Sequence, residues 1–267
     1  MKKLLCVLFS TSLFLTSCEY MNKVATIANN SGILNTGTAT GSLTQTDIIK
    51  GLKTALTIGT DSSVFKTSAL NGYFKDQAIK ILLPPEADVI VSSINSVPGG
   101  KKLLDNVILG INRSAEDAAK SAAPIFKNAI TSMSITDGLA ILKGQNPAAS
   151  VKSQRFDSTA ATGYLKTTTN AQLVQAFSVP INQSLDKKLV AGISTNKAWT
   201  NLTSAYNMVA PVLGKSKVTT NLGQYVTQRA LDGLFLKVGE QELKIRHDPW
   251  KWASTTVGNI LTRVFGK

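Results

Sequence analysis

The chain has 267 residues, of which 43% are hydrophobic, 17% charged and 6% aromatic. This composition is typical of a globular protein and excludes a disordered or fibrous one, and the chain is long enough to bury its own core. Lys and Arg number 29 against 16 Asp and Glu, which gives a formal charge of +13. No basic run is interleaved with aromatic residues, so we expect no nucleic-acid partner.

The first residues have the pattern of an export signal. Lys2 and Lys3 precede a short apolar core, residues 4–15, and the small-residue site LTSC ends at Cys18. The core is shorter than the roughly 18 apolar residues of a spanning helix, and no later segment reaches that length. The site resembles the lipobox of bacterial lipoproteins, whose cysteine carries a diacylglycerol thioether and begins the mature chain. The alternative is an ordinary cleaved signal with a chance cysteine.

These features predict three parts of the chain. Residues 1–17 form a lipoprotein signal peptide, residues 18–43 the lipidated Cys18 and a flexible tether, and residues 44–267 one helical domain. The 25 residues after Cys18 would reach roughly 25–30 Å as a flexible chain. Cys6 leaves with the signal and Cys18 carries lipid, so no thiol remains for a disulfide or a Cys-based metal site. We expect no metal and no cofactor.

The positive charge is uneven along the chain. Removal of Lys2 and Lys3 lowers the formal charge from +13 to +11, and residues 144–267 carry 15 Lys and Arg against 6 Asp and Glu. In an exported lipoprotein this excess favours anionic lipid headgroups or another acidic envelope partner. The alternative is a generally basic surface without a specific site.

The first half of the domain reads as helices separated by short breaks. Thr44 and Asp47 have the spacing of a capping box that opens a helix. Residues 79–83 are extended in character and predict, at most, a short strand or extended segment before Pro84 and Pro85. Further helices are expected over residues 85–97, over 101–121, from Pro124, and from a second capping box, Ser134 with Asp137.

The second half continues the same pattern. Residues 145–158 are polar and predict a loop, followed by one helix over 159–166 and another over 170–189. Helices are also expected over 195–209 and 250–265. The stretch 222–248 lies between these two and carries apolar residues at helical spacing, with a middle that is apolar nearly all round. We therefore predict an all-α, bundle-like domain around this central buried C-terminal helix.

Several stretches resemble one known family. They are GLKTALTIGT at Gly51, IKILLPPE at Ile79, INRSAEDAA at Ile111, SITDGLAILKG at Ser134, FSVPINQSLDK at Phe177, YVTQRALDGLFL at Tyr225, KIRHDP at Lys244 and ILTRVFG at Ile260. In this order they resemble the bacterial lipoprotein family named only as domain of unknown function 4197. The resemblance implies a mostly helical, lipid-anchored envelope protein and implies no activity. The chain departs from the family pattern at an apparent insertion, residues 151–158, and at Gly163, where a larger residue is expected.

The sequence offers few catalytic patterns, and we predict no catalytic residue. His247 is the only histidine, so it cannot supply the several imidazoles of a typical catalytic zinc site, and no G-x-S-x-G motif accompanies it. At a helix end beside Asp248, a surface or capping role is the simpler interpretation. Three Ser-x-x-Lys matches lack the Lys-Thr-Gly partner of serine–lysine acyl enzymes.

The best polar candidates lie on two predicted helices. Asp232 falls within the apolar run of the central helix, so we expect it to be buried and paired, with Arg113, Arg229 or Arg246 as partners. Asn112 and Glu116 are four residues apart and share a helix face. One hypothesis makes Asp232, Arg113 and Glu116 the polar floor of a binding pocket. The other makes them buried ion pairs that hold two helices in register.

These observations favour a lipid-anchored periplasmic protein with a non-enzymatic binding or scaffold role. Its membrane contact would run through the lipid on Cys18, with an anionic lipid or an envelope protein as a further partner. Glu19, where Asp often signals retention in the inner membrane, favours the periplasmic face of the outer membrane. The alternative is an enzyme that acts on envelope lipids or glycans through carboxylates such as Glu116 and Asp232.

Overall fold

The computed structural model describes residues 44–94, 99–187, 192–252 and 262. Over these residues the chain forms helices without a β-strand, so the predicted all-α single domain is confirmed. The elements are α2 (Gln45–Ser68), η1 (Pro85–Ala87), α3 (Asp88–Ile94), α4 (Gly100–Ala119), α5 (Ala122–Ser132), α6 (Ile135–Leu142), α7 (Ala160–Asp186), α8 (Thr195–Val209), α9 (Leu222–His247) and η3 (Pro249–Trp252).

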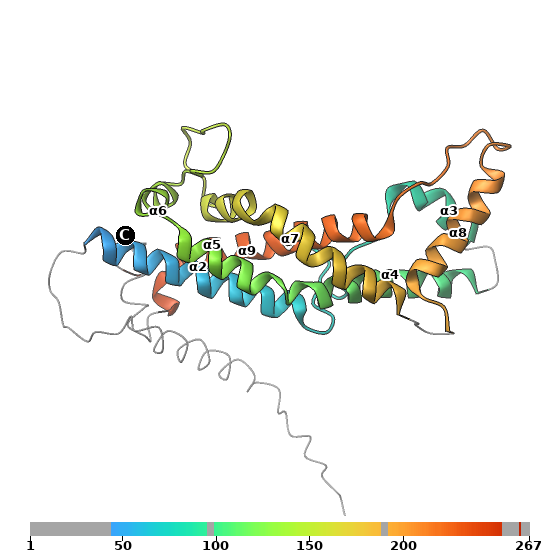
Figure 1. Ribbon diagram of the computed structural model, residues 1–267, viewed down its shortest axis with the longest axis horizontal. Helices are drawn as coiled ribbons and strands as arrows, with labels where there is room; N and C mark the ends of the chain where they lie inside the picture. The colour runs from blue at the N-terminus through green and yellow to red at the C-terminus, as the bar shows by residue number, and fades with distance from the viewer. Residues whose placement is uncertain (1–43, 95–98, 188–191, 253–261, 263–267) are drawn as a thin grey trace, which may run out of the picture.

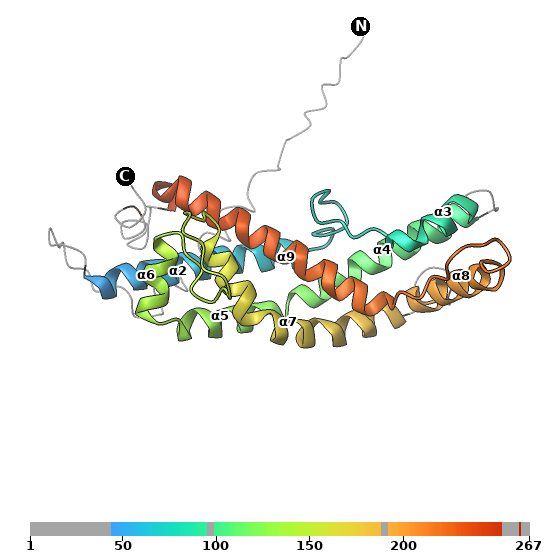
Figure 2. The ribbon, with the colours of Figure 1, turned by 90° about the horizontal axis from the view of Figure 1, so that it is seen from above.

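The domain is elongated, and its long helices follow its long axis (Figures 1 and 2). α7 packs along α4 and α9, and α2 packs along α9 and α5. At one end lie the start of α2 and the short helix α6. At the other end lie α3 and α8, which contact each other; both contact α4, and α8 also contacts α7. The chain therefore enters the described domain at the end opposite α8.

α9 is the central helix that the sequence predicts, with one correction. Its N-cap Asn221 accepts a hydrogen bond from the backbone N–H of Gln224, and α2, α4 and α7 all pack against it. However, the expectation that the apolar middle of this helix is buried on all sides is wrong, because Leu236 is 46% exposed, as is Leu243 further along the helix at 44%. These two leucines are seven residues apart and so share one helix face, which the neighbouring helices leave open.

The extended segment predicted near residues 79–83 is present, without a strand. The Asn112 side chain of α4 takes the place of a neighbouring strand. Its Oδ1 accepts from the Ile81 N–H at 2.9 Å and its Nδ2 donates to the Ile81 carbonyl at 2.7 Å. Gly233 lets this part of the chain approach α9, since a Cβ there would lie 2.9 Å from Tyr73 Cε1 and 3.0 Å from Ile79 Cβ.

The two helices predicted over 159–166 and 170–189 form one continuous helix, α7. The threonine run between them does not end the helix. The hydroxyls of Thr167, Thr168 and Thr169 each donate to a carbonyl four residues earlier, which satisfies them within the helix. Leu165 and Leu173 are fully buried on either side of the run, so the apolar stripe continues through it.

Local signals at helix ends are confirmed where the structure describes them. Thr44 and Asp47 form the predicted capping box, and Ser134 caps α6 by accepting from the Asp137 N–H at 3.0 Å. The closing helix predicted over 250–265 lies mainly outside the described residues, as do the signal peptide, Cys18 and the tether.

Candidate functional site

The six predicted polar residues do not form one cluster. Asn112, Arg113 and Glu116 lie on the inner side of α4, as buried or half-buried side chains. Arg229 and Asp232 pair with each other at the side of α9. Arg246 lies near the C-terminal end of α9 and pairs with a different carboxylate, Glu242. The prediction that Arg113 or Arg246 binds Asp232 is therefore wrong, and each group has its own role.

Glu116 is the centre of the first group and is almost fully buried. Its Oε1 accepts from the backbone N–H groups of Tyr73 and Phe74, both at 3.1 Å, and its Oε2 forms an ion pair with Arg113. Arg113 also donates to Asn71 Oδ1 at 2.8 Å. Both oxygens of this carboxylate are thus occupied by donors from its own helix and from the turn after α2.

Glu116 and Asn112 together bind residues 71–81 to α4. Each side chain satisfies backbone groups that would otherwise be buried without a partner. Tyr73 continues the connection to α9, because its hydroxyl donates to the Ala230 carbonyl at 2.7 Å. Burial, and then the nearby Glu116 charge, raise the pKa of Tyr73. The arrangement supports the hypothesis of buried pairs that hold helices in register.

Asp232 is not buried, contrary to our expectation. Its side chain is 36% exposed, with Arg229 at 3.2 Å and Lys166 of α7 at 3.9 Å. The neighbours Leu231 and Gly233 face inward, and the helical turn between them directs Asp232 to the side. Gln228 donates to it at 3.2 Å. The predicted pairing with Arg229 is confirmed, as an exposed pair within one helix.

A second buried carboxylate, Glu242 of α9, was not identified from the sequence. Its two oxygens accept from the backbone N–H groups of Ala161 and Thr162 at 3.1 and 2.8 Å, and from the Thr162 hydroxyl at 2.8 Å. Arg246 donates to it from Nε at 2.9 Å and from Nη2 at 2.7 Å. Arg246 also donates to the Ile141 carbonyl near the end of α6.

Glu242 of α9 caps the start of α7 in place of the N-cap residue of α7. Thr159 makes no side-chain cap to the helix, whereas Glu242 satisfies two of the first N–H groups from outside it. A negative charge there is also favoured by the helix dipole. The signal was present in the sequence, since Glu242 lies between Val238 and Ile245 on the apolar stripe of α9, where a carboxylate must be buried and paired.

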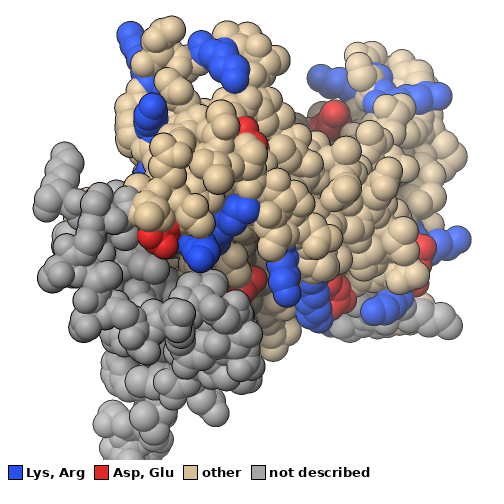
Figure 3. All heavy atoms as spheres, turned by 60° about the vertical axis from the view of Figure 1, so that its left-hand side comes forward, with Lys and Arg blue, Asp and Glu red and all other residues tan. Residues whose placement is uncertain are grey.

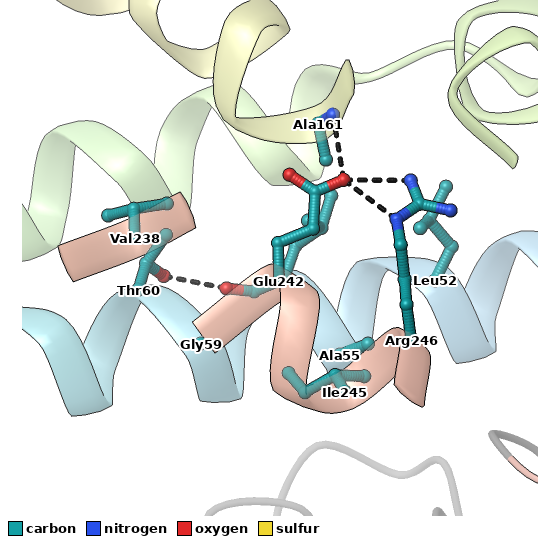
Figure 4. A pocket seen from close by; sticks show the side chains of 10 residues that line it. Leu52, Ala55, Gly59, Thr60, Ala161, Val238, Glu242, Ile245 and Arg246 are labelled. Atoms are coloured by element: carbon teal, nitrogen blue, oxygen red, sulfur yellow. Dashed lines mark hydrogen bonds and ion pairs between the residues drawn. The ribbon is translucent and has the colours of Figure 1, made fainter. Parts of the chain in front are cut away.

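Beside Glu242 and Arg246 lies a small cavity between α2 and α9 (Figure 4). It is lined by Leu52, Ala55, Leu56, Gly59, Thr60, Ala161, Val238, Glu242, Ile245 and Arg246. Its volume of ≈ 20 Å³ leaves room for about one water molecule. Figure 4 shows the Glu242 carboxylate directed at Ala161 and Arg246, and Thr60 donates to the Leu56 carbonyl. As it stands, the cavity is too small for a metabolite, which needs several hundred Å³.

Lys237 forms a third partly buried ion pair. It binds Asp76 at 2.7 Å and Glu240 at 3.0 Å. Burial alone would raise the pKa of Asp76, but hydrogen bonds from Lys237 and from the Ala78 N–H outweigh it and lower the pKa. Burial alone would lower the pKa of Lys237, but the hydrogen bonds and charges of Asp76 and Glu240 outweigh burial and raise this pKa. This pair ties the turn after α2 to α9.

His247 and Asp248 lie at the C-terminal end of α9. His247 is exposed and bonded to Asp248 at 2.9 Å, as expected of a surface residue. Hydrogen bonds from Lys251 and then His247 lower the pKa of Asp248. Lys and Arg are spread over the face in Figure 3 in separate groups rather than one patch. Among the described residues, no set of three or more His, Cys, Asp and Glu is placed to bind a metal, and no helix has the length and apolarity to cross a membrane.

Comparison with known proteins identifies the family. The model of the family described as "Protein of unknown function (DUF4197)" matches residues 42–266. The chain belongs to this family. The match confirms the resemblance seen in the sequence, and it begins two residues before the cap of α2. No curated protein and no solved structure matches the chain.

The two positions at which the sequence suggests departures from the family pattern, residues 151–158 and Gly163, both involve the loop between α6 and α7. Residues 151–158 belong to the loop between α6 and α7, and the ring of Phe156 in this loop lies 5.9 Å from the Arg246 guanidinium. A Cβ on Gly163 would lie 3.0 Å from Asn146 Nδ2 at the start of the same loop. The absence of a side chain at Gly163 therefore lets the loop pack against the first turn of α7.

Proposed function

We propose that this protein is a lipid-anchored envelope protein of the periplasm with a non-enzymatic binding or scaffold role. The observation that carries the proposal is the position of Cys18. It ends a signal with a basic start, an apolar core and a small-residue site, and 25 residues separate it from the cap of α2. A helical domain on such a tether stays close to the membrane surface. Glu19 favours the outer membrane.

The geometry of the domain supports a scaffold rather than an enzyme. A general acid or base needs an oxygen free to reach a substrate proton. Both oxygens of Glu116 accept from two backbone N–H groups and Arg113, and both oxygens of Glu242 accept from α7. The long helices instead form an extended body; α7, with 27 residues, spans roughly 40 Å.

The anchor is tested by the mass of the protein isolated from the cell envelope. We expect a chain that begins at Cys18 and carries the added mass of a diacylglyceryl group and an acyl chain. The variant Cys18→Ser should lack this mass. A chain that retains Met1, or an unmodified Cys18 in the membrane fraction, would contradict the proposal.

The enzyme alternative is tested separately. The double variant Glu116→Gln and Asp232→Asn removes both proposed carboxylates, and circular dichroism shows whether it remains folded. If a folded double variant loses an envelope phenotype that the single variant Glu116→Gln retains, Asp232 has a chemical role and the non-enzymatic proposal is wrong. We expect the two folded variants to behave alike.

A further inference from the structure

The last turn of α8 and the loop that follows it expose apolar side chains at the end of the domain opposite the start of α2 (Figures 1 and 2). We define the apolar tip as residues 208–217, MVAPVLGKSK. Met208 and Val212 are 75% and 87% exposed, and Val209 and Leu213 are at least half exposed. Exposed apolar residues usually occur singly, so four within six residues require an explanation.

The shape of the apolar tip is fixed by hydrogen bonds. At its base, Asn207 Oδ1 accepts from the Val218 N–H and Asn207 Nδ2 donates to the Val218 carbonyl, both at 2.8 Å. At its crown, Gly214 adopts a φ of 62°, and the Lys215 N–H donates to the Ala210 carbonyl at 2.8 Å. This is the six-residue closure that ends many helices. The tip is thus a formed structure that points its apolar side chains outward.

The charges around the apolar tip indicate what it contacts. Lys215 and Lys217 are exposed on the tip itself. Residues 187–231, which include all of α8 and the tip, contain five Lys and one Arg and no Asp or Glu. Acids on the elements that contact α8 include Asp88 of α3, Asp105 of α4, which pairs with Lys101, and Asp186 of α7, which accepts a hydrogen bond from Asn196 of α8. None of them belongs to the tip. The tip therefore presents apolar groups flanked by cations.

We propose that the apolar tip inserts into the surface of an anionic lipid bilayer. Apolar side chains gain free energy when they leave water for the acyl boundary, and lysines beside them bind anionic headgroups. A protein partner could use the apolar side chains, but the absence of acids over residues 187–231 favours a negatively charged surface. Insertion by the tip does not require lipid on Cys18. Only simultaneous membrane contact, through the lipid on Cys18 at one end and the tip at the other, rests on the proposed anchor.

The test places an environment-sensitive fluorophore on the tip. Residues 1–17 lie outside both the described domain and the family match, so the chain from residue 18 keeps the whole domain. With Cys18→Ser, a single cysteine can be introduced by Val212→Cys and labelled with nitrobenzoxadiazole. The matched control is Leu70→Cys, at an apolar residue that is also highly exposed but lies after α2.

We expect the Val212→Cys probe to shift to the blue and brighten with vesicles of phosphatidylethanolamine and phosphatidylglycerol, and the Leu70→Cys probe to stay unchanged. Replacing Lys215 and Lys217 with Gln should weaken vesicle binding about thirtyfold, at ~1 kcal/mol per basic residue. An unchanged Val212→Cys probe, or equal responses of both probes, would overturn the proposal. So would a Val212→Cys signal that depends on protein concentration without vesicles, because it would identify a second copy as the occupant. None of these outcomes bears on Cys18.

Discussion

The Glu116 centre and the apolar tip use their side chains in opposite ways. At the Glu116 centre, which comprises Asn71, Tyr73, Phe74, Arg113 and Glu116, polar groups are buried or half-buried and bond to one another inside the domain. At the apolar tip, apolar groups are exposed, and the hydrogen bonds fix only the backbone. The comparison indicates that the polar interior contributes to stability, whereas the tip is built for contact outside the domain.

Glu116→Ala should give the largest loss of stability. It leaves the Tyr73 and Phe74 N–H groups and the Arg113 charge buried without their acceptor, which costs about 3–5 kcal/mol. The free energy of unfolding from urea titration measures the effect. The matched control is Asp117→Ala, on the next residue, whose exposed pair with Lys120 contributes about 0–1 kcal/mol. Equal losses in the two variants would show that Glu116 does not hold residues 71–81.

Glu242→Ala should destabilise nearly as much, by about 2–4 kcal/mol, since it removes both the cap of α7 and the partner of Arg246. Urea titration again measures the effect, and hydrogen exchange at Ala161 and Thr162 should rise. Glu240→Ala, two residues earlier and more exposed, serves as the control. Protected N–H groups in Glu242→Ala would mean that another group caps α7.

The Asp76–Lys237 pair should make stability depend on pH at both extremes. Asp76 has a lowered pKa in the folded state, so its contribution is present above its unfolded pKa of about 3.9 and is lost as the pH falls through the folded value. Lys237 has a raised pKa, so its contribution is present below about 10.4 and is lost as the pH rises through the folded value. Between these limits Asp76→Asn should cost about 1 kcal/mol.

The check compares unfolding free energies of the wild type and Asp76→Asn across pH. We expect the difference between them to be constant near neutral pH and to shrink on acidification. A difference that grows as the pH falls would contradict the lowered pKa of Asp76.

Asp232→Asn should have the smallest effect, below about 0.5 kcal/mol, because the pairs with Arg229 and Lys166 are exposed to solvent. A thermal unfolding scan at low and high salt measures it. A loss as large as that of Glu116→Ala would mean that Asp232 is buried, as the sequence predicted, and would contradict its exposed position.

These contrasts show what local sequence patterns determine in this fold. The spacing of apolar residues predicts α9, and the capping box at Thr44 predicts the start of α2, because both depend on residues within a few positions. The rotation of α9 about its axis depends on which helices cover it, so Asp232, within an apolar run, is exposed while Glu242 is buried.

The polar partners are the least predictable part. The acceptors and donors of Glu116 and Asn112 include backbone groups 31 to 43 residues away, and no side-chain pattern marks them. Helix α7 was also hard to predict, although its contacts are local. A break was expected near residues 167–169, but the threonine hydroxyls there bond to carbonyls of the same helix and the helix continues. The sequence MVAPVLGKSK does not by itself show that its apolar residues are exposed. Their exposure follows from the position of this segment at the end of the domain.

The central claim is that the tip, and not the rest of the surface, binds anionic membranes. Its most direct test measures how much of the protein floats with anionic vesicles, using the chain from residue 18 with Cys18→Ser. Two variants are compared, each with one Val and one Leu replaced by Ser at exposed positions: Val212 with Leu213 on the tip, and Val179 with Leu70 elsewhere. The account predicts that the first binds about tenfold or more weakly and the second binds as the wild type does. Equal flotation of the two variants would contradict it.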